Sequence, residues 1–265
     1  MQLGVQPTLL AFGEGETVFD EPRRTLRILA DLEELTLTWF RYGPGEQGPD
    51  PHVHRRHSDA FYVLEGELEV GLGPGAAETV RARAGTFAAA PPELVHTFRN
   101  ASDGTAIFLN VHAPSMGFGD MLRARRDGRE EDAARFDQFE PPPDGGRPLA
   151  DAIVSGPDEA DRFDRGNRVI VVKGDLPELS VFEIAFDPAF AVDPHRHDDQ
   201  VDSFYVLEGE VEFTLEDGSV VGGPGTCVSA PPGTVHGFRN PGRSRARILN
   251  LHTPDAGFAG SVREG

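Results

Sequence analysis

Apolar side chains recur along this chain in short runs that are rich in β-branched and aromatic residues. Residues 35–42 (LTLTWFRY) and 179–186 (LSVFEIAF) alternate or stay apolar over eight positions, a pattern typical of β-strands. Residues 61–73 and 204–218 each combine a strand, a glycine-marked bend and a second strand. The 31 glycines and 22 prolines supply the turns between such runs. We therefore predict an all-β chain of short strands, folded as a sandwich or barrel.

The second half of the chain repeats the first. The segment HVHRRHSDAFYVLEGELEV, which begins at His52, recurs 143 residues later as HRHDDQVDSFYVLEGEVEF, beginning at His195. The segment GTFAAAPPELVHTFRN from Gly85 recurs as GTCVSAPPGTVHGFRN, now 140 residues later. The change of offset predicts that the second copy has a hairpin three residues shorter, between the counterparts of Glu67 and Gly85, since turn tips tolerate deletion best.

A segment of different composition lies between the two copies. Residues 121–136 carry mixed charges and sparse apolar positions, which predicts one or two short surface helices. The run PPPDGG at 141–146 is typical of a connector. We therefore predict two domains, residues 1–140 with a C-terminal helical segment and residues 141–265, and expect the helix after Phe258 to be shortened or absent.

The charge of the chain restricts its partners. The formal net charge of −19 would repel a phosphate backbone or an anionic bilayer, so we expect neither nucleic acid nor membrane as a partner. No apolar run approaches the roughly 18 residues of a spanning helix, and the N-terminus lacks a basic signal-peptide region. Cys227 has no second cysteine to pair with, which fits the cytoplasmic location we expect. The one lysine, Lys173, is expected to be exposed at a strand end.

Eight of the nine histidines keep their register across the repeat, and His57 is the one without a counterpart. Two histidines separated by one residue leave the same face of a strand, an aspartate follows after four residues, and a third histidine comes from a later strand. Histidines that only satisfy hydrogen bonds would not repeat in this way, and we predict one metal site per domain. The expected ligands are His52, His54, Asp59 and His96 in the first copy, and His195, His197, Asp202 and His236 in the second.

Three neutral imidazoles and a carboxylate form a borderline donor set. It suits one divalent transition metal per domain, Mn, Fe, Co, Ni, Cu or Zn, and neither Ca nor Mg. Four protein ligands on an octahedral ion leave two positions for water, dioxygen or a chelating substrate.

These residues resemble the motifs of the cupin superfamily. The first motif, H-x-H, an acid, six residues and glycine, occurs in both copies and ends at Gly66 and Gly209. The second motif is complete in the second copy, whose matching residues are Gly225, Pro231, Gly233, His236 and Asn240. In the first copy Glu93 stands where the family has the second glycine. The resemblance extends over about two-thirds of the chain.

The resemblance implies two tandem cupin jelly-roll β-barrels with short connecting helices, each with a metal near one mouth of the barrel. The chain then resembles the bicupins, which include quercetinase-like and gentisate-type dioxygenases, oxalate decarboxylases and pirin-like proteins. The same fold hosts many reactions, so the resemblance is far more specific for fold than for activity.

Two departures from the family pattern concern the metal sites. The family's glutamate is an aspartate at Asp59 and Asp202, which either binds the metal directly, as we expect, or orients a histidine or a water. Glu93 occupies a turn position that favours φ > 0. If one site is degenerate, we therefore expect it to be the first, and we expect activity at the second.

Other residues have two interpretations. Strand alternation turns four phenylalanines toward the metal side, where they line a substrate pocket or form plain core: Phe61, Phe98, Phe204 and Phe238. His112 and His252, in the repeated pattern LN-x-H, either line that pocket or stabilise the barrel. His57, whose counterpart is Gln200, is expected in a loop.

The pattern favours an enzyme without establishing one. The leading hypothesis is a metal-dependent oxidoreductase of the dioxygenase type, acting on a small oxygen-bearing substrate for which an aromatic ring is one candidate. The alternatives are a metal-dependent lyase or isomerase on a sugar or keto acid, and a non-enzymatic ligand-binding protein. No residue is singled out as catalytic beyond the metal ligands, and a homodimer is expected to be possible.

Overall fold

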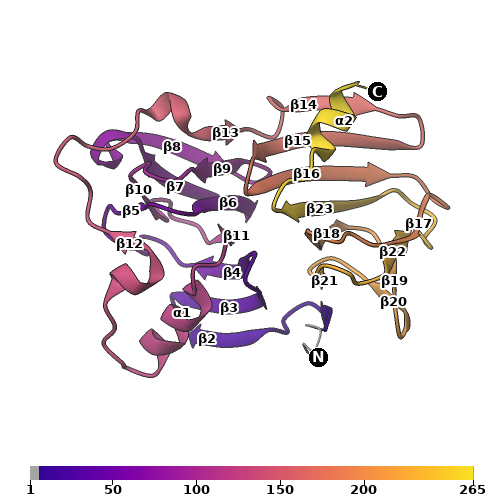
Figure 1. The fold of residues 1–265 in the computed structure, drawn as a ribbon, viewed down its shortest axis with the longest axis horizontal. Coiled ribbons are helices and arrows are strands. Elements are labelled where there is room, and N and C mark those ends of the chain that lie inside the picture. The colour runs from indigo at the N-terminus through magenta and orange to yellow at the C-terminus, as the bar shows by residue number, and fades with distance from the viewer. Residues whose placement is uncertain (1–5, 265) are drawn as a thin grey trace. The chain divides into compact units, whose positions relative to one another are not determined.

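Residues 6–264 are described by a computed structural model, in which they form 23 β-strands and two α-helices. Contacts group these residues into two compact units (Figure 1). The first unit comprises residues 15–159, and the second comprises residues 160–264 together with the N-terminal residues up to 14. The prediction of an all-β chain with two tandem domains is confirmed.

The first unit is built from a seven-stranded and a three-stranded sheet, with a further two-stranded ladder. The seven-stranded sheet has the order β13-β9-β6-β11-β4-β3-β2. Its strands are Ile153–Ser155, Phe87–Ala90, Ser58–Glu65, Ala106–Ala113, Thr36–Tyr42, Arg24–Asp31 and Glu16–Asp20. The smaller sheet, β10-β7-β8, consists of His96–Arg99, Glu67–Leu72 and Glu78–Arg83, and the ladder joins β12 (Gln138–Phe139) to β5 (Val53–His54).

The second unit repeats this arrangement with a seven-stranded and a four-stranded sheet. The larger sheet has the order β1-β21-β18-β23-β16-β15-β14. Its strands are Thr8–Leu10, Cys227–Ala230, Val201–Glu208, Ala246–Thr253, Leu179–Phe186, Arg168–Leu176 and Asp161–Asp164. The smaller sheet, β17-β22-β19-β20, consists of Ala191–His195, His236–Arg239, Val211–Leu215 and Gly218–Gly222.

Each unit has its own hydrophobic core between its two sheets. In the first unit, Phe61 and Phe108 of the larger sheet and Phe98 of the smaller one belong to one buried cluster. In the second unit, Phe204 and Phe238 belong to the equivalent cluster. Alternating strand positions turn these side chains inward, so the twofold periodicity of the sequence accounts for the two-sheet jelly roll.

The repeat predicts the length of one hairpin correctly. The connection between β7 and β8 takes residues 73–77, whereas residues 216–217 connect β19 and β20. The strands on either side keep equivalent pairings. The three missing residues are therefore confined to the turn, where their loss disturbs no ladder.

The observed units differ from the predicted boundary between residues 140 and 141. Residues 141–159 belong to the first unit, because β13 pairs with β9 through Ile153↔Ala89. In the same way β1 pairs with β21 of the second unit through Thr8↔Ser229. The short strand that precedes each copy thus completes the sheet of the other copy. The connector composition at 141–146 marks a turn on the first unit rather than the boundary.

Helices follow the last strand of each copy, as predicted. Helix α1 (Phe118–Arg126) is followed by a 3₁₀ helix at Ala133–Phe136, and helix α2 (Phe258–Glu264) is shorter. Among residues 6–264, no helix is both long enough and apolar enough to cross a membrane. The expectation that Lys173 is exposed is wrong. Its side chain is fully buried, and its Nζ lies 3.5 Å from Glu183 Oε1.

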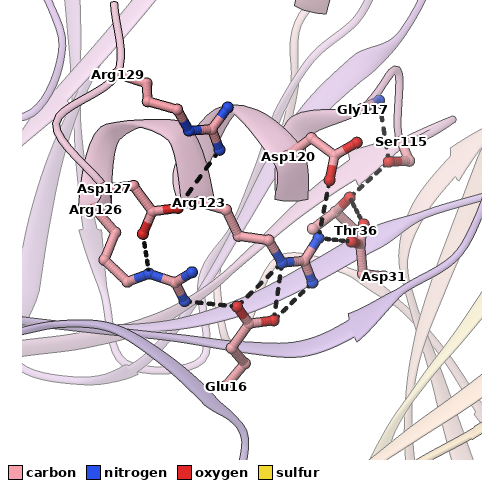
Figure 2. A network of polar contacts seen from close by, with 10 residues as sticks. All are labelled: Glu16, Asp31, Thr36, Ser115, Gly117, Asp120, Arg123, Arg126, Asp127 and Arg129. Carbon is pink, nitrogen blue, oxygen red and sulfur yellow. Dashed lines mark hydrogen bonds and ion pairs between the residues drawn. The ribbon is translucent and has the colours of Figure 1, made fainter.

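Helix α1 is attached to the edge of its sheet by a charged network (Figure 2). The Arg123 guanidinium donates to the Glu16 carboxylate from Nη2 at 2.7 Å and to Asp31 from Nη1 at 2.5 Å. Arg126 donates to Glu16 at 2.8 Å. These charge-assisted hydrogen bonds connect α1 to β2 and β3, and they lower the pKa of Glu16 below its usual value of 4.5, with the bond from Arg123 as the largest cause.

Replacing Glu16 with glutamine tests this attachment. A carboxyl group whose pKa is depressed by folding stabilises the fold above its unfolded pKa, and the contribution disappears as the pH falls through the folded value. We expect Glu16→Gln to lower the free energy of unfolding by about 0.5–1 kcal/mol at pH 7, because Glu16 is partly exposed. Urea unfolding at pH 7 and pH 4 should show the difference between variant and wild type shrinking at the lower pH. A difference independent of pH would contradict this role.

Candidate metal centres

The strand pairings of the first unit bring its predicted ligands together. His52 and His96 exchange two backbone hydrogen bonds, of 3.1 and 3.0 Å, and His54 ends the short strand β5. Asp59 lies in β6, opposite His112 of β11. Each of the ligands His52, His54, Asp59 and His96 offers an atom within 4.8 Å of the others. The spacing of the motif therefore assembles a compact group once the two sheets close.

The second unit forms the same group from equivalent strands. His195 pairs with His236 where β17 meets β22, and Asp202 lies opposite His252. The four predicted ligands, His195, His197, Asp202 and His236, again offer atoms within 4.8 Å of one another. Both halves thus contain a three-histidine, one-aspartate group, as the repeat predicts.

Backbone carbonyls hold the imidazoles in one orientation. The Nδ1 atoms of His52 and His96 lie 2.9 and 3.0 Å from the carbonyls of Asp50 and Leu94. The Nδ1 of His54 lies 2.9 Å from the carbonyl of Asp137. A carbonyl can only accept, so each Nδ1 carries the proton and each Nε2 keeps a lone pair. His195 and His236 repeat this with Asp193 and Thr234 at 3.0 and 2.9 Å.

This arrangement fits a metal ion. Among the described residues, His54 Nε2 is a buried nitrogen without a hydrogen-bond partner, although its lone pair faces the other ligands. A buried acceptor left unpaired costs about 1–3 kcal/mol unless something binds it. Imidazole Nε2 atoms fixed by an acceptor at Nδ1 are the usual ligand form of histidine. The two centres can each hold one divalent transition metal, as predicted.

The aspartates present one oxygen to the imidazoles and have the other held in place. Asp59 Oδ2 lies 3.1 Å from His96 Nε2, while Asp59 Oδ1 accepts a hydrogen bond from the Asn110 amide. In the second unit, Asp202 Oδ2 lies 3.1 Å from His236 Nε2, and Asn250 donates to Asp202 Oδ1. One carboxylate oxygen is thereby available for a metal, and direct ligation by the two aspartates remains a prediction.

The two asparagines are site residues that motif reasoning missed. Asn110 and Asn250 precede His112 and His252 by two residues and face the same side of the strand. Both asparagines occupy the same position of the repeated pattern LN-x-H, and this repetition could have identified them as site residues.

The electrostatics keep the carboxylates charged and favour neutral imidazoles at His52 and His54. At His236 burial acts against the charged form, but the hydrogen bond to Asp202 and its charge outweigh burial and raise the pKa above its usual value. Burial, followed by the neighbouring His96, lowers the pKa of His52 to about 3. Burial opposes ionisation of Asp59, but the neighbouring imidazoles of His112 and His96 outweigh it and lower the pKa to about 2. The pKa of Asp202 is lowered in the same way, with His252 as the largest favourable cause. Neutral imidazole and ionised carboxylate are the states that bind a metal.

The two centres differ in their exposure. All four ligands of the first centre are buried, whereas His195 and His197 of the second are only half-buried. The first centre also adjoins a cavity of about 170 Å³, whose wall includes His52, Asp59 and His112. Further around the cavity lie Arg24, Phe40, Tyr42, Gln47, Phe98, Asn110, Phe118, Met121, Arg125 and Gln138.

The predicted pocket residues fall into two groups. Phe98 and His112 line the cavity of the first unit. Phe61, Phe204 and Phe238 belong to the hydrophobic cores, where Phe204 and Phe238 pack with ring centroids 5.4 Å apart. His252 is buried, with its Nε2 3.4 Å from Asp202 Oδ1. A role in substrate binding remains a prediction for these residues.

The turn at Glu93 has the same backbone form as its counterpart in the second copy and is strained by the non-glycine residue there. Glu93 has φ 68° and Gly233 has φ 83°, so both lie in the left-handed region. Their N–H groups donate to the carbonyls of His54 and His197 at 2.6 and 2.7 Å. The turn therefore forms in both copies. In the first copy a non-glycine residue holds the left-handed backbone conformation, which costs about 1–2 kcal/mol. Glu93 does not prevent the four ligands from meeting.

His57 lies in the connection between β5 and β6, as expected, and its side chain is fully buried there. Its Nδ1 lies 2.9 Å from Asp137 Oδ2, and its Nε2 lies 2.9 Å from His112 Nδ1. Asp137 lies outside the repeated segments, so the comparison of the two copies could not predict its contact with His57.

Comparison with known proteins agrees with this architecture. Residues 38–112 and 182–252 each match the protein family described as "Cupin domain". Quercetin 2,3-dioxygenase of Bacillus subtilis is 23% identical over 88% of this chain and 78% of its own length. Germin-like protein 1-1 of Oryza sativa subsp. japonica is 38% identical, but over only 27% of this chain and 34% of its own length.

Two kinds of solved structure share the fold. An oxalate decarboxylase from Bacillus subtilis superposes with a TM-score of 0.65 at 15% identity, covering 95% of this chain and 78% of the other. A putative glyoxylate-induced protein from Pseudomonas aeruginosa gives a TM-score of 0.66 at 17% identity, covering 92% and 88%.

Metal content tests the two centres separately. The wild-type protein loaded with Mn(II) and desalted should retain up to two ions per chain, while His96→Ala and His236→Ala should each retain up to one, because each variant loses one imidazole ligand. Elemental analysis gives the stoichiometry, and thermal unfolding verifies that both variants fold. Two retained ions in either folded variant would contradict the ligand assignment.

Proposed function

We propose, because the chain belongs to the Cupin domain family and is a bicupin, that it is a metal-dependent enzyme whose first centre converts a small, anionic, oxygen-bearing substrate. The leading reaction is an oxidation of the dioxygenase type. The observation that carries the proposal is the cavity beside the first centre, which combines metal-ligand side chains with two arginines. The similarity to a quercetin dioxygenase over most of the chain supports the reaction class.

In this proposal the metal of the first centre is held by His52, His54, His96 and Asp59. A bound transition metal would supply Lewis acidity and redox chemistry to a substrate at its open positions. The chain itself supplies a water-poor chamber, since all four ligands are buried. His112 and Asn110 in the cavity wall offer hydrogen-bonding groups beside that position.

The size of the cavity limits the substrate. Its volume is about 170 Å³. A buried cavity of about 150 Å³ is enough for benzene, whereas pockets for drug-sized ligands take about 300–1,000 Å³. A single ring, or an acid smaller than one ring, therefore fits this space. A three-ring flavonol belongs to the larger class and would require the cavity to open.

Two arginines favour a negatively charged substrate. The Arg125 guanidinium lies 3.5 Å from Gln138 Oε1, and among residues 6–264 no carboxylate lies within ion-pair distance of it. Arg24 Nε is buried without a hydrogen-bond partner among the same residues. Burial and then the charge of Arg24 lower the pKa of Arg125. A carboxylate in the cavity would relieve this repulsion and satisfy the free donors.

The small charged cavity also favours a second candidate, an oxygen-independent lyase. A compact acid held between arginines and a metal can lose carbon dioxide without dioxygen, and the fold is shared with oxalate decarboxylases. The identity of 15% limits that comparison to the fold. A binding protein without turnover is the third outcome to be tested.

We further propose that the protein is cytoplasmic and that it can form a homodimer. The single cysteine, Cys227, is fully buried, and burial raises its pKa to about 12. A thiol in this state is inert, so a reducing environment would not be needed to protect it.

Oxygen uptake distinguishes these reactions. The Fe(II)- and Mn(II)-loaded proteins should consume dioxygen with a single-ring acid such as gentisate, and a flavonol serves as the size control. Because the cavity adjoins the first centre, His96→Ala should reduce turnover far more than His236→Ala. Carbon dioxide release from a small acid without oxygen uptake would instead establish the lyase. Binding of these acids without any turnover would contradict both enzyme hypotheses.

The charge preference has its own test. Arg125→Leu should raise KM for a carboxylate substrate by about tenfold, because a charge-assisted hydrogen bond contributes about 1.5–3 kcal/mol at most and this one is partly exposed. KM for an uncharged ring of the same size should change less than twofold. Equal changes for the two substrates would show that Arg125 shapes the cavity without selecting charge.

A further inference from the structure

We infer that Asp137 is a positioning residue that presets the H-x-H segment of the first centre, and that the two centres therefore bind the same metal with different affinities. The inference rests on the ligand sets proposed above, but it is independent of the reaction. It comes from a buried aspartate that lies outside both repeats and is not itself one of the predicted ligands.

Asp137 binds the backbone that carries the ligands. Its side chain is 1% exposed, and Oδ2 accepts from the N–H groups of Arg55 and Arg56 at 3.1 and 2.8 Å. The same oxygen accepts from His57 Nδ1 at 2.9 Å, and Oδ1 accepts from Arg56 Nε at 3.1 Å. Its own carbonyl accepts from His54 Nδ1 at 2.9 Å. One residue thus holds the loop after His54 and the ring of His54 together.

These contacts resist displacement. A buried carboxylate is stable only while its hydrogen bonds are made, so the two backbone N–H groups and His57 Nδ1, which all donate to Oδ2, have to stay in place around it. Asp137 itself has φ 58°, a left-handed conformation in which carbonyl and side chain turn toward the same loop. Asparagine and aspartate tolerate that conformation better than other non-glycine residues.

The residues that follow Asp137 extend the attachment. Strand β12 pairs with β5 through Gln138↔His54 and Phe139↔Val53. The Arg55 guanidinium lies 3.9 Å from the ring centroid of Phe139. The ligand strand β5 is therefore fixed by a ladder on one side and by Asp137 at its end.

The attachment continues to the far side of the metal group. His57 stacks on His54 with ring centroids 3.9 Å apart. It also bonds to His112, whose Nε2 lies 3.6 Å from Asp59 Oδ1. Asp137 thereby positions the predicted ligand His54 directly, and His57 extends the same group of contacts to His112.

The second unit has no such residue among its described positions. Gln200 replaces His57, and its buried Nε2 has no hydrogen-bond partner there. His197, the counterpart of His54, is 29% exposed, and within residues 6–264 its Nδ1 has no acceptor at hydrogen-bond distance. Before a metal binds, the ring of His197 is therefore held by fewer contacts than the ring of His54. Preorganisation of this kind raises affinity without adding a ligand.

The test uses the full-length chain and Mn(II), in two backgrounds that isolate the centres. His236→Ala leaves the first centre and His96→Ala leaves the second. Free Mn(II) is followed by electron paramagnetic resonance during titration. We expect at least tenfold tighter binding in the first-centre background. Adding Asp137→Asn there should weaken binding ten- to a hundredfold, the range for loss of a partner that orients a ligand. In the second-centre background it should change binding less than twofold.

Matched variants keep the result interpretable. Arg56→Ala removes only the exposed partner of Asp137, so it should alter first-centre affinity less than threefold. His57→Gln introduces the residue that the second copy carries and should weaken binding less than Asp137→Asn does. It serves as the test if Asp137→Asn fails to fold, as judged by thermal unfolding. Equal affinities in the two backgrounds, or an unchanged first-centre affinity in folded Asp137→Asn and His57→Gln, would overturn the inference.

Discussion

The hydrogen bond from an imidazole Nδ1 to a backbone carbonyl is the contact on which both centres depend. It occurs at His52, His96 and His54 in the first unit and at His195 and His236 in the second. Each bond fixes the tautomer and turns Nε2 toward a common point. The carbonyls of Asp50, Leu94, Asp137 and Thr234 belong to loops and turns beside the strands, and that of Asp193 belongs to β17. Assembly of the ligands therefore depends on these connections as well as on the packing of the two sheets.

The repeat provides the same ligand frame twice but surrounds it differently. In the first unit, the segment after α1 returns to the ligand loop through Asp137 and β12, and the ligands are buried beside a cavity. In the second, His195 and His197 stay half-buried. This contrast supports chemistry at the first centre, although the motifs of the second copy match the family more fully. Burial and outer contacts, rather than motif completeness, distinguish the two.

Much of this architecture follows from local patterns. Twofold periodicity predicts the strands, and the constant offsets of 143 and 140 predict both ligand groups and the shortened hairpin. The exchange of β1 and β13 could not be predicted, because each strand pairs with residues far along the chain. Asp137 was missed for the same reason, since it lies about 80 positions from His57 and outside the repeat. The size of the cavity depends on how Phe98, Phe118 and their neighbours pack.

Anomalous scattering from crystals of the Mn-loaded protein tests the central claim most directly. The account predicts one peak per unit, at bonding distance from three histidine Nε2 atoms and one aspartate oxygen. In the first unit the histidines would be His52, His54 and His96, each still bound through Nδ1 to the carbonyl described here. A peak bound through Nδ1, or no peak at either group, would contradict it.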